Sequence, residues 1–87
     1  MYCNPTSDGS EYLGRVSVTE TGRQCQEWSA QAPHTHSYTQ DSMFPDASVK
    51  AAVNYCRNPS SSGSSLWCFT TDVNTEREPC DVHSCSE

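Results

Sequence analysis

The chain has 87 residues, a formal net charge of −6 and a hydrophobic content of 33%. This length suits a single domain with a small core, because two halves would each be too small to fold alone. The five basic residues are scattered, which argues against nucleic acid or anionic membranes as partners, since phosphate binding needs clustered Lys and Arg. No apolar run has the length of a signal peptide or a membrane span, so direct membrane insertion is not expected.

The first two elements that we predict are short. Residues 15–19 alternate two valines with polar side chains, which is typical of a strand. Residues 47–53 have a helix-forming composition, although a helix of this length is too short to be stable alone. Turn-forming residues separate the segments, so we expect a loop-rich fold with little regular structure.

The last elements flank a serine tract. Residues 60–65 carry five serines and one glycine, and this tract lies between the third and fourth cysteines. Its position predicts a surface loop of fixed length instead of a flexible linker. Residues 66–71 follow and read as a second strand, because aromatic and β-branched residues are bounded there by turn signals.

The six cysteines are the strongest signal: Cys3, Cys25, Cys56, Cys68, Cys80 and Cys85. An even number of cysteines in a short chain predicts disulfides formed in an oxidising compartment, and thus an extracellular domain. Zinc is the alternative, but structural zinc sites draw on CxxC pairs, and the chain has none. Zinc would also leave two cysteines unexplained, so we expect disulfides and no metal or cofactor. The missing leader indicates an excerpt from a longer exported protein, with Met1 added for expression.

Five segments between the cysteines carry a very specific pattern: GRQCQEW at 22–28, PHTH at 33–36, NYCRNP at 54–59, LWCFTTD at 66–72 and CDVHSC at 80–85. On these the whole chain, residues 1–87, resembles a single kringle domain. It is most similar to the kringle of Ror-family receptor tyrosine kinases. Two features depart from the family pattern: residues 41–53 are somewhat long, and Pro79 stands where an aromatic or aliphatic residue is usual.

The resemblance implies a small disulfide-rich fold of loops and short antiparallel strands. It also implies a pairing of first with sixth, second with fourth and third with fifth cysteine. The implied bonds are Cys3–Cys85, Cys25–Cys68 and Cys56–Cys80. We expect Trp28 to pack in the core, with Tyr55 and Phe69 also inclined to packing.

Many kringles bind lysine in a trough that has an aromatic floor and two carboxylates for the ammonium group. The resemblance places Trp67 and Phe69 on that floor. It places Ser60 and Ser62 at the two carboxylate positions, and neither residue carries charge. Trp67 is open to both readings, as an exposed trough wall or as part of the core.

The other end of the trough also departs from the lysine-binding pattern. Nine residues after the tryptophan, where lysine binders often have Arg, the chain has Glu76, and Arg77 follows at an often aromatic position. A ligand carboxylate would meet a like charge there. We therefore predict that neither lysine nor 6-aminohexanoic acid binds.

Other chemistry is disfavoured. His34 and His36 would point the same way on an extended segment and could hold a metal with His83 or an acid, but the family uses this region to brace a loop. No serine lies in a GxSxG context, and the cysteines are expected to form disulfides, so an enzyme is not expected. Glu76 and Glu78 flank Arg77 and suggest local charge pairing.

The function that we predict is a non-catalytic extracellular protein-interaction module, monomeric in isolation, of a Wnt-binding Ror-type receptor. The alternatives are a lysine-binding kringle of a plasminogen-like protease and a structural spacer. Exposure of Leu66, Trp67 and Phe69 would favour a binding module, and burial of all three would favour a spacer.

Overall fold

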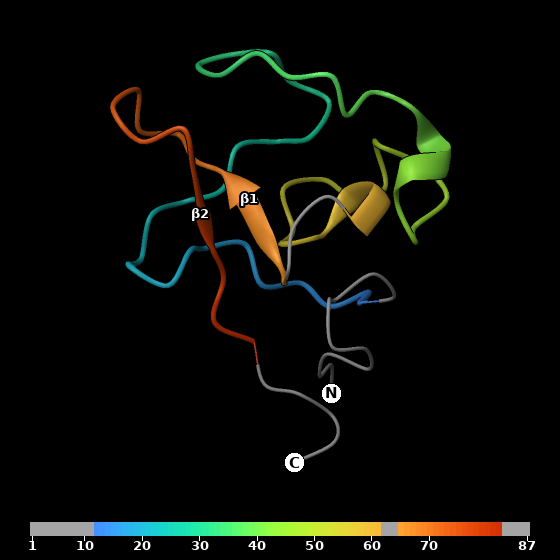
Figure 1. The fold of residues 1–87 in the computed structure, drawn as a ribbon, viewed down its shortest axis with the longest axis horizontal. Helices are drawn as coiled ribbons and strands as arrows, with labels where there is room; N and C mark the ends of the chain where they lie inside the picture. Colours follow the sequence, from blue (N-terminus) through green and yellow to red (C-terminus); the bar gives the residue numbers. More distant parts are fainter. Residues whose placement is uncertain (1–11, 62–64, 83–87) are drawn as a thin grey trace.

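The computed structural model describes residues 12–61 and 65–82. Their regular structure consists of two 3-10 turns and two strands: η1 (Asp41–Met43), η2 (Pro59–Ser61), β1 (Trp67–Phe69) and β2 (Arg77–Pro79). The strands are antiparallel neighbours, with Trp67 opposite Pro79 and Phe69 opposite Arg77. Figure 1 shows this pair beside a long irregular path that contains η1 and η2. The loop-rich, disulfide-rich fold that the sequence predicts is confirmed.

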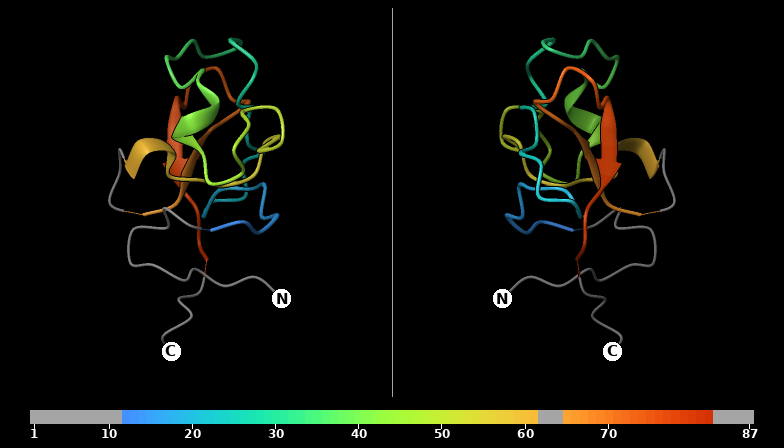
Figure 2. Two further views of the ribbon diagram at one scale, coloured as in Figure 1. Left: turned by 90° about the vertical axis from the view of Figure 1, so that its right-hand side faces the viewer. Right: turned by 90° about the vertical axis from the view of Figure 1, so that its left-hand side faces the viewer.

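Strand β1 is the centre of the domain, because segments far apart in sequence bond to it or to its neighbours. Isolated bridges join Cys25 to Thr70 and Arg57 to Trp67. The side views place η2 and the chain near residues 12–20 on opposite sides of the strand pair (Figure 2). No helix in the described ranges is long or apolar enough to cross a membrane.

Two expected elements differ from the prediction. The predicted strand at 15–19 is wrong: it is reduced to one bridge, between Val18 and Gln24. The chain reverses directly afterwards, with Thr19 N–H bonded to the carbonyl of Arg23 at 2.8 Å. Residues 47–53 form turns instead of a helix, since Ala47 and Val53 both adopt positive φ, at 64° and 49°. A left-handed residue at each end interrupts helical hydrogen bonding.

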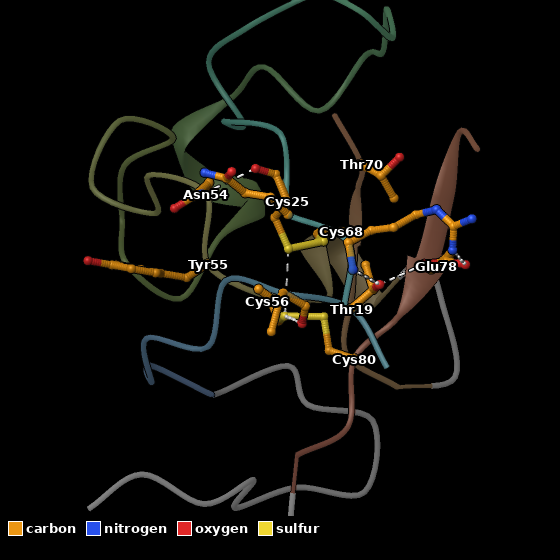
Figure 3. The surroundings of a disulfide bond; sticks show 12 residues. Thr19, Cys25, Asn54, Tyr55, Cys56, Cys68, Thr70, Glu78 and Cys80 are labelled. Carbon is orange, nitrogen blue, oxygen red and sulfur yellow. Dashed lines mark hydrogen bonds and ion pairs between the residues drawn. A yellow bond between two sulfur atoms is a disulfide. The ribbon is translucent and has the colours of Figure 1, made fainter. Parts of the chain in front are cut away.

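Two disulfides form the middle of the core. Cys25–Cys68 has an S–S distance of 2.03 Å, and Cys56–Cys80 has one of 2.06 Å. The two bonds contact each other through the Sγ atoms of Cys25 and Cys56, which lie 3.9 Å apart (Figure 3). The four cysteines of the described ranges are therefore paired as the resemblance implied. The third expected bond, Cys3–Cys85, lies outside the described residues.

Trp28 organises the remaining core, as expected. Its side chain is 1% exposed, and its Nε1 donates to the carbonyl of Tyr55 at 2.7 Å. Its ring packs edge-on against five aromatic or imidazole rings, those of His36, Tyr38, Phe44, Trp67 and Phe69. A short chain with few aliphatic residues thus fills its interior with aromatic rings and sulfur.

Candidate functional site

The candidate site is an aromatic face formed by Trp67 and Phe69. These two residues are two apart in β1, so their side chains lie on the same side of the strand pair. Their ring centroids are 5.0 Å apart at an angle of 75°. Both side chains are largely buried, at 7% and 3% exposed, and Leu66 before them is 1% exposed. The structure therefore places the two expected floor residues together but leaves them little contact with solvent.

Arg77 covers this aromatic face. It lies opposite Phe69 in the β1–β2 register, which turns its side chain to the same side of the sheet. Its guanidinium carbon is 5.0 Å from the centroid of the Trp67 ring and 5.8 Å from that of Phe69. Both distances are within the range of a cation–π interaction. A positive charge of the chain itself thus rests on the rings.

Other rings surround the rest of the face. His36 stacks on Phe69 with centroids 4.9 Å apart and an angle of 17°, and Tyr38 meets Trp67 edge-on at 5.5 Å. The indole Nε1 of Trp67 donates to Oδ1 of Asn58 at 3.3 Å. These contacts fix the orientation of both rings, so the face is preorganised.

The polar residues expected at the two ends of the trough are less closely associated with the rings. Ser60 is exposed and adopts a left-handed backbone with φ 55° in η2, while Ser62 lies outside the described residues. Glu76 is exposed, and its backbone carbonyl accepts a hydrogen bond from Thr70 N–H at 3.1 Å. Within the described ranges no hydrogen bond or ion pair joins a carboxylate to the Arg77 guanidinium.

Charge pairing around β2 differs from the expectation. Arg77 and Glu78 are consecutive strand residues and point to opposite faces. Glu78 instead accepts a hydrogen bond from Nη1 of Arg23 at 3.0 Å, and Arg23 Nε donates to Asp72 at 3.1 Å. The Thr19 hydroxyl completes the group by donating to Glu78 at 2.6 Å (Figure 3). This network therefore joins the turn at 19–23 to β2.

The pKa values of this network follow from its contacts. The Thr19 and Thr21 hydroxyls, followed by the Arg23 charge, hold the pKa of Glu78 below its usual value. The Asn74 backbone N–H, followed by Arg23, lowers the pKa of Asp72. The two carboxylates in turn raise the pKa of Arg23.

The two described histidines brace a loop. His34 Nε2 lies 2.9 Å from the carbonyl of Asp72, and His36 Nε2 lies 3.0 Å from that of Ala30. His36 Nδ1 accepts a bond from Tyr38 N–H at 3.1 Å. Gln26 spans the same loop, since its side chain bonds both the N–H and the carbonyl of His34. The ring nitrogens facing these backbone groups serve the structural role that the resemblance implied; the expected third member, His83, lies outside the described residues.

Arg57 is a structural residue that the sequence reasoning missed. It is 1% exposed and forms a two-pronged ion pair with Asp46, at 2.8 and 2.9 Å. Its Nη1 donates to the carbonyls of Gly14 and Cys56, both at 2.8 Å. The sequence does contain one signal of this burial, because Arg57 directly follows a core cysteine within NYCRNP. The partner carboxylate eleven residues earlier carried no corresponding sequence signal.

The comparisons agree with this architecture. The family model for the kringle domain matches residues 3–85, so the chain belongs to the kringle family. Among curated proteins, the chain is similar to goat (Capra hircus) plasminogen, with 45% identity over 80 residues. The match covers 92% of this chain, and the chain spans only 62% of that relative. The kringle expectation is thereby confirmed, and a kringle is a non-catalytic module.

Proposed function

We propose that this kringle is an extracellular protein-interaction module that does not bind lysine. One observation carries the exclusion of lysine: the aromatic face is occupied by Arg77 and has no carboxylate at Ser60, where lysine-binding kringles supply one. Kringles typically reside in exported proteins, and the disulfides favour the same compartment.

The loss of the two carboxylates removes enough binding free energy to abolish lysine binding. A hydrogen bond to a charged group contributes about 1.5–3 kcal/mol. The loss of two, at Ser60 and Ser62, costs roughly 3–6 kcal/mol, or about two to four decades of affinity. At the other end, Glu76 would oppose a ligand carboxylate. A micromolar site would thereby become undetectable.

Immobilised lysine provides the test. The unaltered chain should pass through the column without retention. A variant that combines Ser60→Asp, Ser62→Asp and Glu76→Arg with Arg77→Gln restores the charges and removes the arginine over the rings, and it should be retarded. Retention of the unaltered chain, with release by 6-aminohexanoic acid, would contradict the proposal.

A structural spacer is the second candidate, and burial favours it. Leu66, Trp67 and Phe69 are at most 7% exposed, so this face offers little apolar surface to a partner. The most exposed large hydrophobic side chain among the described residues is Val73, at 73%. If the domain binds a protein, Val73→Asp in the parent protein should weaken that complex. A spacer would tolerate this change while the fold is kept.

Two parents fit an interaction module. The segments at 16–19, 21–26 and 80–82 favour a Ror-type receptor tyrosine kinase, whose context is Wnt signalling. The likeness to plasminogen favours a protease precursor, although Ser60 and Glu76 disfavour lysine binding in that setting. The domain that follows in the parent, a kinase or a protease, distinguishes these two.

A further inference from the structure

The aromatic face of Trp67 and Phe69 has the properties of a cation site. Two rings are held at a fixed angle by neighbouring rings and by the Trp67 indole hydrogen bond. An aromatic ring presents a negative face, and two fixed rings attract a positive group placed over them. The face therefore suits an ammonium or guanidinium group from any source.

We propose that Arg77 is the resident cation of this face and so acts as a specificity residue that excludes cationic side chains of a partner. The inference deepens the proposed function and rests on it. The absence of carboxylates at Ser60 and Ser62 removes the attraction for a cationic side chain of a partner. Arg77 goes further, because it occupies the place over the rings and repels a second positive charge.

The fold keeps Arg77 in place. Its pairing with Phe69 across the strands sets its side chain over the rings, where its guanidinium carbon is 5.0 and 5.8 Å from their centroids. Guanidinium is planar and weakly hydrated, so it stacks on aromatic rings better than ammonium does. A tethered group also avoids the translational entropy that a free cation must lose on binding. An external cation therefore competes against a group that is always present.

The neighbouring acids do not draw Arg77 away. Glu78 points to the other face, where Arg23, Thr19 and Thr21 engage it. Among the described residues the Arg77 guanidinium forms no ion pair, and it contacts the two rings. These ring contacts account for its position over the aromatic face.

The test compares Arg77→Gln with Arg15→Gln, which removes the same charge from an exposed arginine elsewhere. Ethylguanidinium chloride is the probe, because it has no carboxylate and does not report on lysine binding as such. Ring signals of Trp67 and Phe69 are followed by NMR. The unaltered chain and R15Q should show no saturable shift, whereas R77Q should show one. Because Arg77 competes with the probe for the same rings, the apparent affinity of R77Q should be at least about tenfold higher than that of the unaltered chain, whose shifts should stay linear over the same range of probe concentration.

Two further variants keep the test decisive. Arg77→Lys retains a cation and should remain unresponsive to the probe. If R77Q does not fold, Arg77→Met replaces it, because Met preserves an apolar stem over the rings. Acrylamide quenching should rise in R77Q and not in R15Q, since Trp28 is 1% exposed and Trp67 is the tryptophan that becomes accessible.

The outcomes separate the two proposals. Equal affinity of R77Q and the unaltered chain for ethylguanidinium would overturn the role of Arg77, while leaving the absence of lysine binding intact. Binding of 6-aminohexanoic acid to the unaltered chain would instead overturn the proposed function. A saturable response of R77Q alone supports the resident cation.

Discussion

Individual residues determine the backbone strain and the ligand specificity of this domain. Val53 adopts φ 49°, although a β-branched side chain is strongly disfavoured in the left-handed region. The position is imposed by its surroundings, because the Val53 carbonyl accepts a bond from Trp28 N–H at 2.8 Å. The Val53 carbonyl therefore helps to hold the backbone of the central tryptophan in place.

Replacement of Val53 by Gly should stabilise the domain. A left-handed L-residue costs about 1–2 kcal/mol, and Gly avoids that cost but loses more chain entropy on folding. The side chain is 39% exposed, so little packing is lost. We expect a net gain of about 0.5–1 kcal/mol in urea unfolding. Val73→Gly, at an exposed position without positive φ, is the control and should give no gain.

Replacement of Arg57, in contrast, should destabilise the domain. Arg57→Met would leave the Asp46 carboxylate and two backbone carbonyls without their donor, at a cost of about 3–5 kcal/mol, as when one partner of a buried pair is removed. Arg15→Met, on the surface, should change the free energy of unfolding by less than about 0.5 kcal/mol. Equal effects of the two changes would mean that the buried pair contributes nothing.

At the scale of elements, the turn at 19–23 is tied to β2 and to the loop after β1 by charge. Arg23 contacts both Asp72 and Glu78, and the thermal stability of this junction should depend on pH. The pKa values of both carboxylates are lowered in the folded state, so their contribution is present above their unfolded values, near pH 4. It is lost as the pH falls through the lower folded values.

This dependence can be measured as Tm between about pH 6 and pH 2.5. Glu78→Gln should flatten the acid limb of the curve, because the titrating group with a lowered pKa is gone. Glu27→Gln, at an exposed acid outside this network, should leave it unchanged. High salt should also weaken the dependence, since exposed charges are screened. An unchanged acid limb in E78Q would contradict the role of the network.

The elements also show where sequence patterns succeed and fail. The 66–71 pattern predicted β1 because its residues are buried and paired on both sides. The equally regular alternation at 15–19 yields only one bridge, since its backbone divides its hydrogen bonds between residues 23–25 and Cys56 instead of pairing with a single strand. The position of Arg77 over Trp67 depends on the β1–β2 register, and the environment of Arg57 depends on distant chain segments. Neither can be read from local sequence.

At the scale of the whole molecule, covalent bonds substitute for a large apolar core. The six cysteines and the segments between them were sufficient to predict the family and two of the bonds that the structure contains. The fold depends on these bonds, because the two inner disulfides lie in contact at its centre. What the sequence could not supply was the closure of the aromatic face by the chain itself.

Removal of the Cys25–Cys68 bond, as Cys25→Ser with Cys68→Ser, should therefore be severe. The bond closes a loop with a sequence separation of 43, and the chain-entropy estimate for its loss is about 4 kcal/mol. We expect loss of the folded state at 37 °C, seen as collapsed dispersion in NMR spectra. A cooperative thermal transition close to that of the unaltered chain would contradict this expectation.

The central claim is that this kringle presents an aromatic face already occupied by its own cation and unsuited to lysine. The most direct test is an NMR titration of the unaltered chain with 6-aminohexanoic acid, following the ring signals of Trp67 and Phe69. We predict no saturable shift up to about 10 mM ligand, as expected for a site that has lost both charges. Saturable shifts of these two rings, with a micromolar dissociation constant, would contradict the account.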